Sequence, residues 1–215
     1  GRVMATLAVM KARIANDLRR DDLTTDIANA IADAIEAYQD QRFAFKETRD
    51  FTFNTVAGQA IYTSADAANV ANILKVDYIV LTIGGQPFQL EPMWPDVLEV
   101  SSSSLSGTGT PGHYALYNEA IRLYPPPADV YAARIGCKRR VTAPATDGET
   151  GNRWMTTGDR LIRARAMADL YAFIIQDTEQ AQVYYSLAKD VLEQLNGMAQ
   201  DLQQVGPMIV KAWEC

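Results

Sequence analysis

The spacing of apolar residues changes twice along this chain, and these changes constrain its fold more than any other feature. Apolar residues recur every three or four positions in 6–20 and 24–38, every two positions from residue 50 onward, and every three or four again in 157–203. Steps of three or four are typical of amphipathic helices, and a step of two is typical of half-buried strands. The sequence therefore predicts helices towards both ends and strands in the middle.

The middle of the chain also contains clear turn signals. Residues 74–83, LKVDYIVLTI, predict the strongest strand, and Gly84-Gly85 predicts a two-residue hairpin turn after it. A short helix is predicted at 94–100, because Pro95 suits a first helical turn. A Ser/Gly/Thr-rich loop is predicted from Ser101 to Gly112, followed by a second hairpin that turns at Asn118-Glu119.

We therefore predict an α+β fold in which the N- and C-terminal helices form an antiparallel α-helical bundle. An antiparallel β-rich module is inserted between them, and an extended tail follows the last helix because Gly206-Pro207 stops it. The predicted boundaries are 1–48 for the N-terminal helices, 49–142 for the β-module, 143–205 for the C-terminal helices and 206–215 for the tail.

The composition argues against several classes of function. The formal net charge is −6 and the pI about 4.8, which does not favour tight binding to a phosphate backbone. The chain has one histidine, His113, and two cysteines, Cys137 and Cys215, so we predict no metal site, no cofactor and no catalytic residues. No apolar run approaches the roughly 18 residues that span a bilayer, so no membrane partner is predicted.

Two groups of basic residues are candidate binding sites. Either group is able to contact DNA or an acidic protein, but three cations in an acidic chain are too few for tight DNA binding. We favour salt bridges between neighbouring copies, for which the surplus acidic residues supply partners. The two groups are Lys138-Arg139-Arg140 and the helical residues Arg160, Arg163 and Arg165.

The last ten residues are unusually apolar for a chain terminus. The alternatives are a frayed end, which is the default for termini, and a segment that docks on a partner. Docking is favoured because tryptophan is enriched at interface hot spots. The terminal Cys215 is a candidate for an inter-chain disulfide, whereas Cys137 is predicted to be a buried free thiol. The predicted docking residues are Met208, Ile209, Val210 and Trp213.

Four segments resemble the head–tail adaptor, or connector, proteins of tailed bacteriophages and gene transfer agents. In chain order they are MATLAVMKARIANDLRRDDL, FTFNTVAGQAIYT, GTPGHYALYNEAIRLYPPPAD and NRWMTTGDRLIRARAMADLYA. The sequence departs from the family pattern at Asn118-Glu119-Ala120, where the family carries a glycine-bearing turn, and this departure is predicted to loosen the turn.

The resemblance implies a non-enzymatic virion protein of the neck, made in the host bacterial cytoplasm. It implies a homo-oligomeric ring of about twelve copies, docked beneath the portal protein and above a downstream tail or neck protein. DNA would pass through the ring without sequence-specific binding, and the C-terminal segment would reach the portal. The alternative is a virion-associated cell-wall-degrading enzyme, which requires two carboxylates across a cleft, and no glutamate here lies in a recognisable motif.

Overall fold

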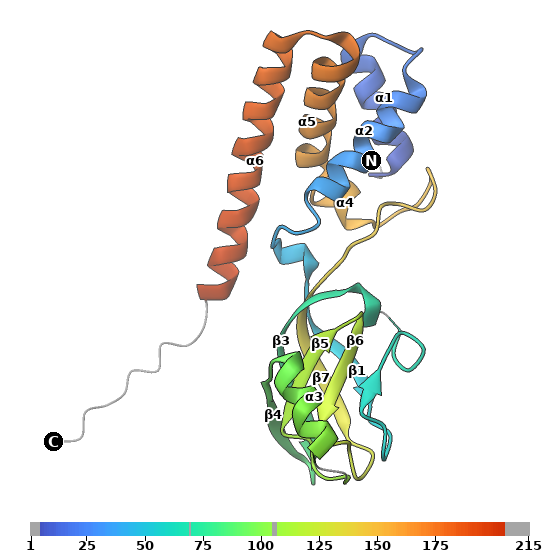
Figure 1. Ribbon diagram of the computed structural model, residues 1–215. Helices are drawn as coiled ribbons and strands as arrows, with labels where there is room; N and C mark the ends of the chain where they lie inside the picture. The colour runs from blue at the N-terminus through green and yellow to red at the C-terminus, as the bar shows by residue number, and fades with distance from the viewer. Residues whose placement is uncertain (1–4, 69, 105–106, 205–215) are drawn as a thin grey trace, which may run out of the picture. The chain divides into compact units, whose positions relative to one another are not determined.

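The protein, for which we describe a computed structural model, divides into two compact units. The structure describes residues 5–68, 70–104 and 107–204, with side chains for 5–68, 70–102 and 107–198. The helical unit comprises Gly1–Phe45 with Val141–Cys215, and the β unit comprises Lys46–Arg140 (Figure 1). Each unit has its own apolar core.

The helical unit contains five of the α-helices. Thr6 caps the first of them, because its hydroxyl accepts a hydrogen bond from the Val9 amide at 3.3 Å. Ile27, Ile31 and Ile35 share one face of the second helix and are all buried. The elements of this unit are α1 (Leu7–Leu18), α2 (Thr24–Ala37), α4 (Arg153–Thr156), α5 (Asp159–Asp169), the π-helix η3 (Leu170–Ile175) and α6 (Thr178–Gln204).

The helical core surrounds Trp154, whose side chain is completely buried. Its ring packs edge-on against Phe43 and Phe45, with ring centroids 5.9 and 5.2 Å away. The indole Nε1 donates a hydrogen bond to the Val141 carbonyl at 2.7 Å, so its polar atom is also satisfied. Asn152 fixes the start of α4, since its side-chain oxygen accepts from the Trp154 amide at 3.1 Å.

The β unit is a seven-stranded curled sheet with the strand order β1-β7-β3-β4-β5-β6-β2. Most neighbouring strands pair antiparallel, but β4 and β5 pair in parallel through Glu91↔His113 and Pro92↔Tyr114. The α-helix α3 (Pro95–Ser104) connects these two strands. The strands are β1 (Glu47–Asn54), β2 (Ile61–Tyr62), β3 (Ile73–Ile83), β4 (Gln86–Pro92), β5 (His113–Tyr117), β6 (Ala120–Tyr124) and β7 (Ala132–Arg139), and the short 3₁₀ helices are η1 (Ala44–Lys46) and η2 (Val70–Asn72).

The predicted fold class was wrong. The prediction was an antiparallel helical bundle with an inserted antiparallel β-module and an extended tail. The structure is instead a mixed α+β fold, with a seven-stranded curled sheet and six α-helices within the described residues. One helix, α3, belongs to the β unit, and the parallel β4–β5 pair needs such a crossover because parallel strands cannot be joined by a tight hairpin.

The second hairpin turns at Asn118-Glu119 as predicted, but the turn is not loosened. Tyr117 pairs with Ala120 across a two-residue turn, and both Asn118 (φ 51°) and Glu119 (φ 55°) adopt left-handed backbone conformations. Positive φ at both central residues is the geometry that matches the twist of a tight hairpin. The turn is therefore closed without glycine, at a conformational cost carried mainly by Glu119.

Candidate functional site

An exposed row of apolar side chains lies along α3. The row consists of Trp94, which is 80% exposed, with Val97 (51%) and Val100 (67%); we call it the α3 stripe. Steps of three residues place these side chains on neighbouring positions of one helix surface. Leu98 is completely buried, so α3 has one face in the β unit and one in solvent.

A polar cluster centred on Arg122 holds α3 against the β5–β6 hairpin. The Arg122 Nη2 donates to the Ser102 hydroxyl at 2.8 Å, and Nη1 donates to the Tyr117 hydroxyl at 2.9 Å. Arg122 also forms an ion pair with Glu99, whose Oε1 accepts from the Tyr117 hydroxyl at 2.7 Å. The Arg122 side chain is only 15% exposed, so these charge-assisted contacts are partly shielded from water.

This cluster explains why α3 is longer than predicted. Ser101 and Ser102 were expected in a loop, but both lie in α3. The Ser102 hydroxyl receives the Arg122 hydrogen bond, and the Ser101 carbonyl accepts from the Tyr124 hydroxyl at 3.3 Å. Contacts from β6 therefore stabilise helical turns whose own composition favours a loop.

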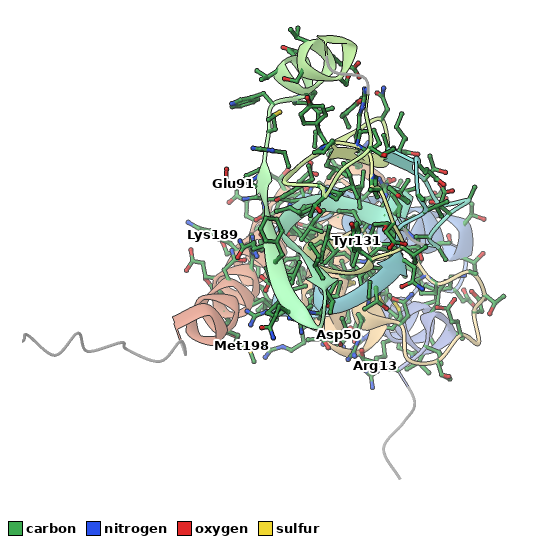
Figure 2. All side chains as sticks on the ribbon, turned by 90° about the horizontal axis from the view of Figure 1, so that it is seen from below. Arg13, Asp50, Glu91, Tyr131, Lys189 and Met198 are labelled. Carbon is green, nitrogen blue, oxygen red and sulfur yellow. The ribbon has the colours of Figure 1, made fainter. Side chains whose placement is uncertain are left out.

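The α3 stripe has the properties of a protein-docking surface. Scattered exposed valines are ordinary, but a largely exposed tryptophan in line with two valines is a contiguous apolar patch. The polar cluster of Arg122, Glu99, Tyr117 and Ser102, which we call the clamp, holds this patch in place, and this lowers the entropy that binding a partner would cost. Figure 2, with all described side chains drawn, shows α3 at the edge of the β unit.

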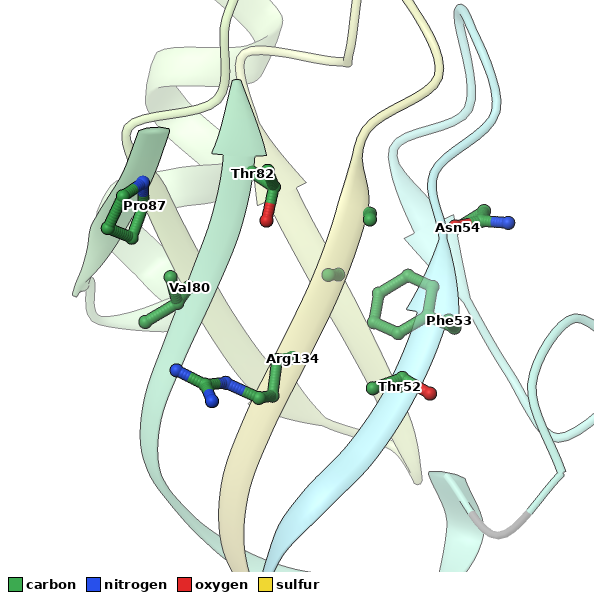
Figure 3. Close-up of a pocket in the computed structure, with 9 residues that line it drawn as sticks. Thr52, Phe53, Asn54, Val80, Thr82, Pro87 and Arg134 are labelled. Atoms are coloured by element: carbon green, nitrogen blue, oxygen red, sulfur yellow. The ribbon is translucent and has the colours of Figure 1, made fainter. Parts of the chain in front are cut away.

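A shallow hollow of about 560 Å³ lies on the sheet, across β1, β7 and β3 (Figure 3). Thr52, Arg134 and Val80 form one cross-strand row in it. Arg134 is the single ionisable side chain among the residues that line the hollow. With one cation and two threonine hydroxyls, the hollow can bind a polar or anionic group, but it offers no nucleophile–base pair.

The basic residues predicted as binding sites do not form one patch. Lys138 and Arg139 are consecutive in β7, so their side chains point to opposite faces of the sheet. Lys138 pairs across the sheet with Glu47 and Lys75. Arg140 follows the strand, and its amide donates to the Asn72 carbonyl at 2.6 Å.

The helical arginines differ in exposure. Arg160 is exposed at the start of α5, Arg163 is half-buried, and Arg165 pairs with Asp169 at 3.0 Å inside the helical unit. Arg165 is therefore a structural residue, whereas Arg160 and Arg163 are able to meet a partner. The predicted docking residues Met208, Ile209, Val210 and Trp213, and Cys215, lie outside the described residues.

Cys137 is a buried free thiol, as predicted. Its side chain is 1% exposed, and burial raises its pKa to about 11, so it stays protonated at neutral pH. His113 lies on β5 with its Nε2 3.8 Å from a Glu91 carboxylate oxygen. Over the described ranges no group of His, Cys, Asp and Glu is arranged to hold a metal ion. Nor does any helix in that part of the chain have both the length and the apolar character needed to cross a membrane.

The α3 stripe was missed at the level of sequence. A signal was present: Trp94, Val97 and Val100 are spaced by three, which places them next to one another on a helix surface. No pattern within 94–104 reveals the clamp, because Arg122 and Tyr117 come from strands further along the chain.

A firmly held helix that exposes tryptophan and valine to solvent is typical of proteins that act by binding other proteins. Comparison with known families identifies the kind of protein. The chain matches the family of the SU10 adaptor protein over residues 5–211 and belongs to that family. This confirms the resemblance carried by the four sequence motifs. It is a family of phage structural adaptors and not of enzymes, so the chain is a virion component that contacts other virion proteins. No curated protein matches the chain.

Proposed function

We propose that this protein is a head-to-tail adaptor that forms a ring beneath the portal of a tailed phage. About twelve copies join the portal to the tail and leave a central passage for DNA. The protein is made in the host bacterial cytoplasm and becomes part of the virion neck. The net charge of −6 per copy supports a passage that DNA crosses without being held.

The α3 stripe supports this proposal most strongly. Its tryptophan and two valines are exposed in the single chain and would be buried only against another protein. We assign the stripe to the downstream tail or neck protein. We assign the apolar C-terminal residues, including Trp213, to the portal. Two different partners on two separate segments are what a joining protein needs.

Lys138, Arg139, Arg140, Arg160 and Arg163 remain candidates for salt bridges between neighbouring copies. An isolated chain should be largely monomeric, because the like charges of about twelve acidic copies oppose ring closure without a template. The portal would supply that template. Light scattering of the protein with and without the portal of the same phage tests this directly: a stable ring in the absence of portal contradicts it.

The assignment of α3 is tested by two variants, each with an exposed valine changed to aspartate. Val97→Asp places a charge in the α3 stripe, and Val130→Asp places the same charge elsewhere in the β unit, where Val130 is 61% exposed. We expect Val97→Asp particles to carry the adaptor on their portals but to lack tails, as seen by electron microscopy. Val130→Asp particles should be complete. Equal tail attachment in the two variants would show that α3 does not contact the tail.

The portal assignment is tested by deleting residues 206–215. We expect the shortened protein to melt at the same temperature as the full chain and to lose binding to purified portal. A deletion that unfolds the protein would instead place these residues in the core of the monomer.

A further inference from the structure

A second exposed apolar surface lies where α5 passes into α6. Phe173 is 71% exposed and Ile174 is 45% exposed, and both belong to the π-helix η3 at one end of the helical unit (Figure 1). We call these two side chains the η3 tip. Single exposed apolar residues are ordinary, but two adjacent large ones form a continuous apolar patch, which is a candidate interaction site.

The η3 tip is displayed by an unusual backbone conformation. η3 is a π-helix of six residues, in which hydrogen bonds join residues five apart instead of four. This wider turn sets the direction in which Phe173 and Ile174 point. Such segments are rare in proteins and occur frequently at functional sites. The conformation of η3 is therefore a second and independent indication that the tip has a function.

The turn that follows the η3 tip is held by specific contacts. Within η3, the ring of Tyr171 stacks on Tyr184 of α6, with ring centroids 5.5 Å apart. After a left-handed residue at Gln176, the Asp177 amide donates a hydrogen bond to the Tyr171 carbonyl at 2.9 Å. The Asp177 side chain then accepts from the Gln180 amide at 3.0 Å and caps the start of α6. A partner would therefore meet a preformed surface, and little conformational entropy would be lost on binding.

The chain on both sides of the η3 tip is acidic. Residues 166–188 contain Asp169, Asp177 and Glu179 but no lysine or arginine. Asp169 pairs with Arg165 at 3.0 Å, whereas Glu179 is exposed at the start of α6. The neighbouring helix α2, which contacts η3, contains three acids and no basic residue. The tip is therefore an apolar surface with an acidic border.

We propose that the η3 tip docks in an apolar pocket of another virion protein, and that lysine or arginine residues border this pocket. Phe173 and Ile174 enter the pocket, and Glu179 meets its basic border. A second copy of this chain is a poorer partner, because each copy carries a net charge of −6 and like charges repel. The contact goes beyond the function proposed above, which uses only the α3 stripe and the C-terminal residues. It rests on the membership of the chain in a family of structural adaptors.

Photo-cross-linking in intact virions tests this contact. A photoreactive phenylalanine analogue replaces Phe173 or, as the matched control, Ser186, which is exposed on α6 about two turns beyond the tip. We expect position 173 to form an adduct with one peptide of another virion protein, and position 186 not to reach that peptide. Adducts of position 173 with this chain itself, or no adduct at all, would overturn the proposal.

The basic border of the pocket is tested in the same virions by charge reversal. Glu179→Arg should lower the yield of the position 173 adduct at least about threefold, because it places a cation against the cations of the partner. Asp190→Arg makes the same change at another exposed position of α6 and should leave the yield unchanged. Equal yields in the two variants would show that the pocket has no basic border.

The apolar part of the contact is tested by Phe173→Asp, with Ser186→Asp as the control. Both positions are exposed, so both variants should melt at the same temperature as the parent protein. We expect Phe173→Asp to lower the yield of infectious particles at least about a hundredfold, and Ser186→Asp to leave it unchanged. Equal yields from the two variants would overturn the docking of the tip. Neither test changes α3 or residues 206–215, so this proposal and the proposed function fail separately.

Discussion

The helical unit and the β unit are each stabilised internally by a different kind of interaction. The helical unit has one apolar core around Trp154, built from α1, α2, α4, α5 and α6. The β unit combines a strand ladder and a separate apolar cluster with the polar clamp on α3. The stability of an apolar core depends on how completely side chains fill its volume, whereas the stability of a polar clamp depends on each hydrogen-bonding partner being present. Within the β unit, loss of a clamp residue should therefore act locally on α3, whereas a change in the packing of the strands should destabilise the whole unit.

The largest expected effect comes from removing the centre of the helical core. Trp154→Ala should lower the free energy of unfolding by about 3–5 kcal/mol, because it leaves a cavity beside Phe43 and Phe45 and removes the hydrogen bond to Val141. Urea denaturation followed by helical circular dichroism measures this. Trp94→Ala is the matched control and should change stability by less than about 0.5 kcal/mol, since Trp94 is 80% exposed. Similar losses in the two variants would contradict the central role of Trp154.

The second-largest loss of stability is expected from a substitution at a crowded position in the β unit. A Cβ added at Gly136 would overlap the ring of Tyr78, its cross-strand partner on β3. Gly136→Ala should destabilise the protein by about 1–3 kcal/mol, as overpacking does. Adding Tyr78→Ala to the same chain should recover part of this loss in a thermal unfolding experiment. Gly148→Ala, where nothing lies within 4 Å, is the control. An unchanged melting temperature for Gly136→Ala would show that the ladder adjusts freely at this point.

The clamp is tested by Arg122→Ala. This change leaves Glu99 and the Tyr117 and Ser102 hydroxyls without their cation, at a cost of about 1–3 kcal/mol that is local to α3. We expect faster amide hydrogen exchange in α3 while the core strand β3 keeps its protection. Arg134→Ala, on the outer face of the sheet, should leave α3 unaffected. Protection of α3 that survives Arg122→Ala would show that burial of Leu98 alone holds the helix.

The smallest effect is a gain. Glu119→Gly should stabilise the β unit by about 0.5–1 kcal/mol, because glycine adopts the required positive φ without steric cost. Glu119→Ala keeps the Cβ and should give no such gain. Thermal unfolding of the two variants side by side makes the comparison, and equal stability would mean that the turn carries no strain.

Local elements were predictable where the pattern of apolar residues is strong. The stripe of Ile27, Ile31 and Ile35 predicts α2, and the run at 74–83 with Gly84-Gly85 predicts the β3–β4 hairpin, and the structure confirms both. The helical spacing that starts at residue 157 is present as α5, but this helix continues into the π-helix η3. Periodicity cannot detect this change, because a π-helix differs by one hydrogen-bond step in a pattern that is otherwise helical.

Long-range pairing was not predictable in the same way. The parallel contact of Glu91 with His113 joins strands separated by α3, and no turn signal marks it. The clamp likewise depends on Arg122 meeting Glu99 across more than twenty residues. Residue spacing reports neighbours along the chain, whereas the fold class and the α3 stripe depend on neighbours in space.

The pairing of β1 with β7 has a mechanical consequence. Glu47 starts β1 and pairs with Lys138 near the end of β7, so the two chain connections of the β unit enter at the same end of an antiparallel pair. The hydrogen bonds of such a pair run perpendicular to the strands. A pull on both connections therefore loads these bonds one after another, starting at Glu47, whereas a pull along the strands would load them all together. Under tension carried by its own chain, the β unit would unzip from this end at low force.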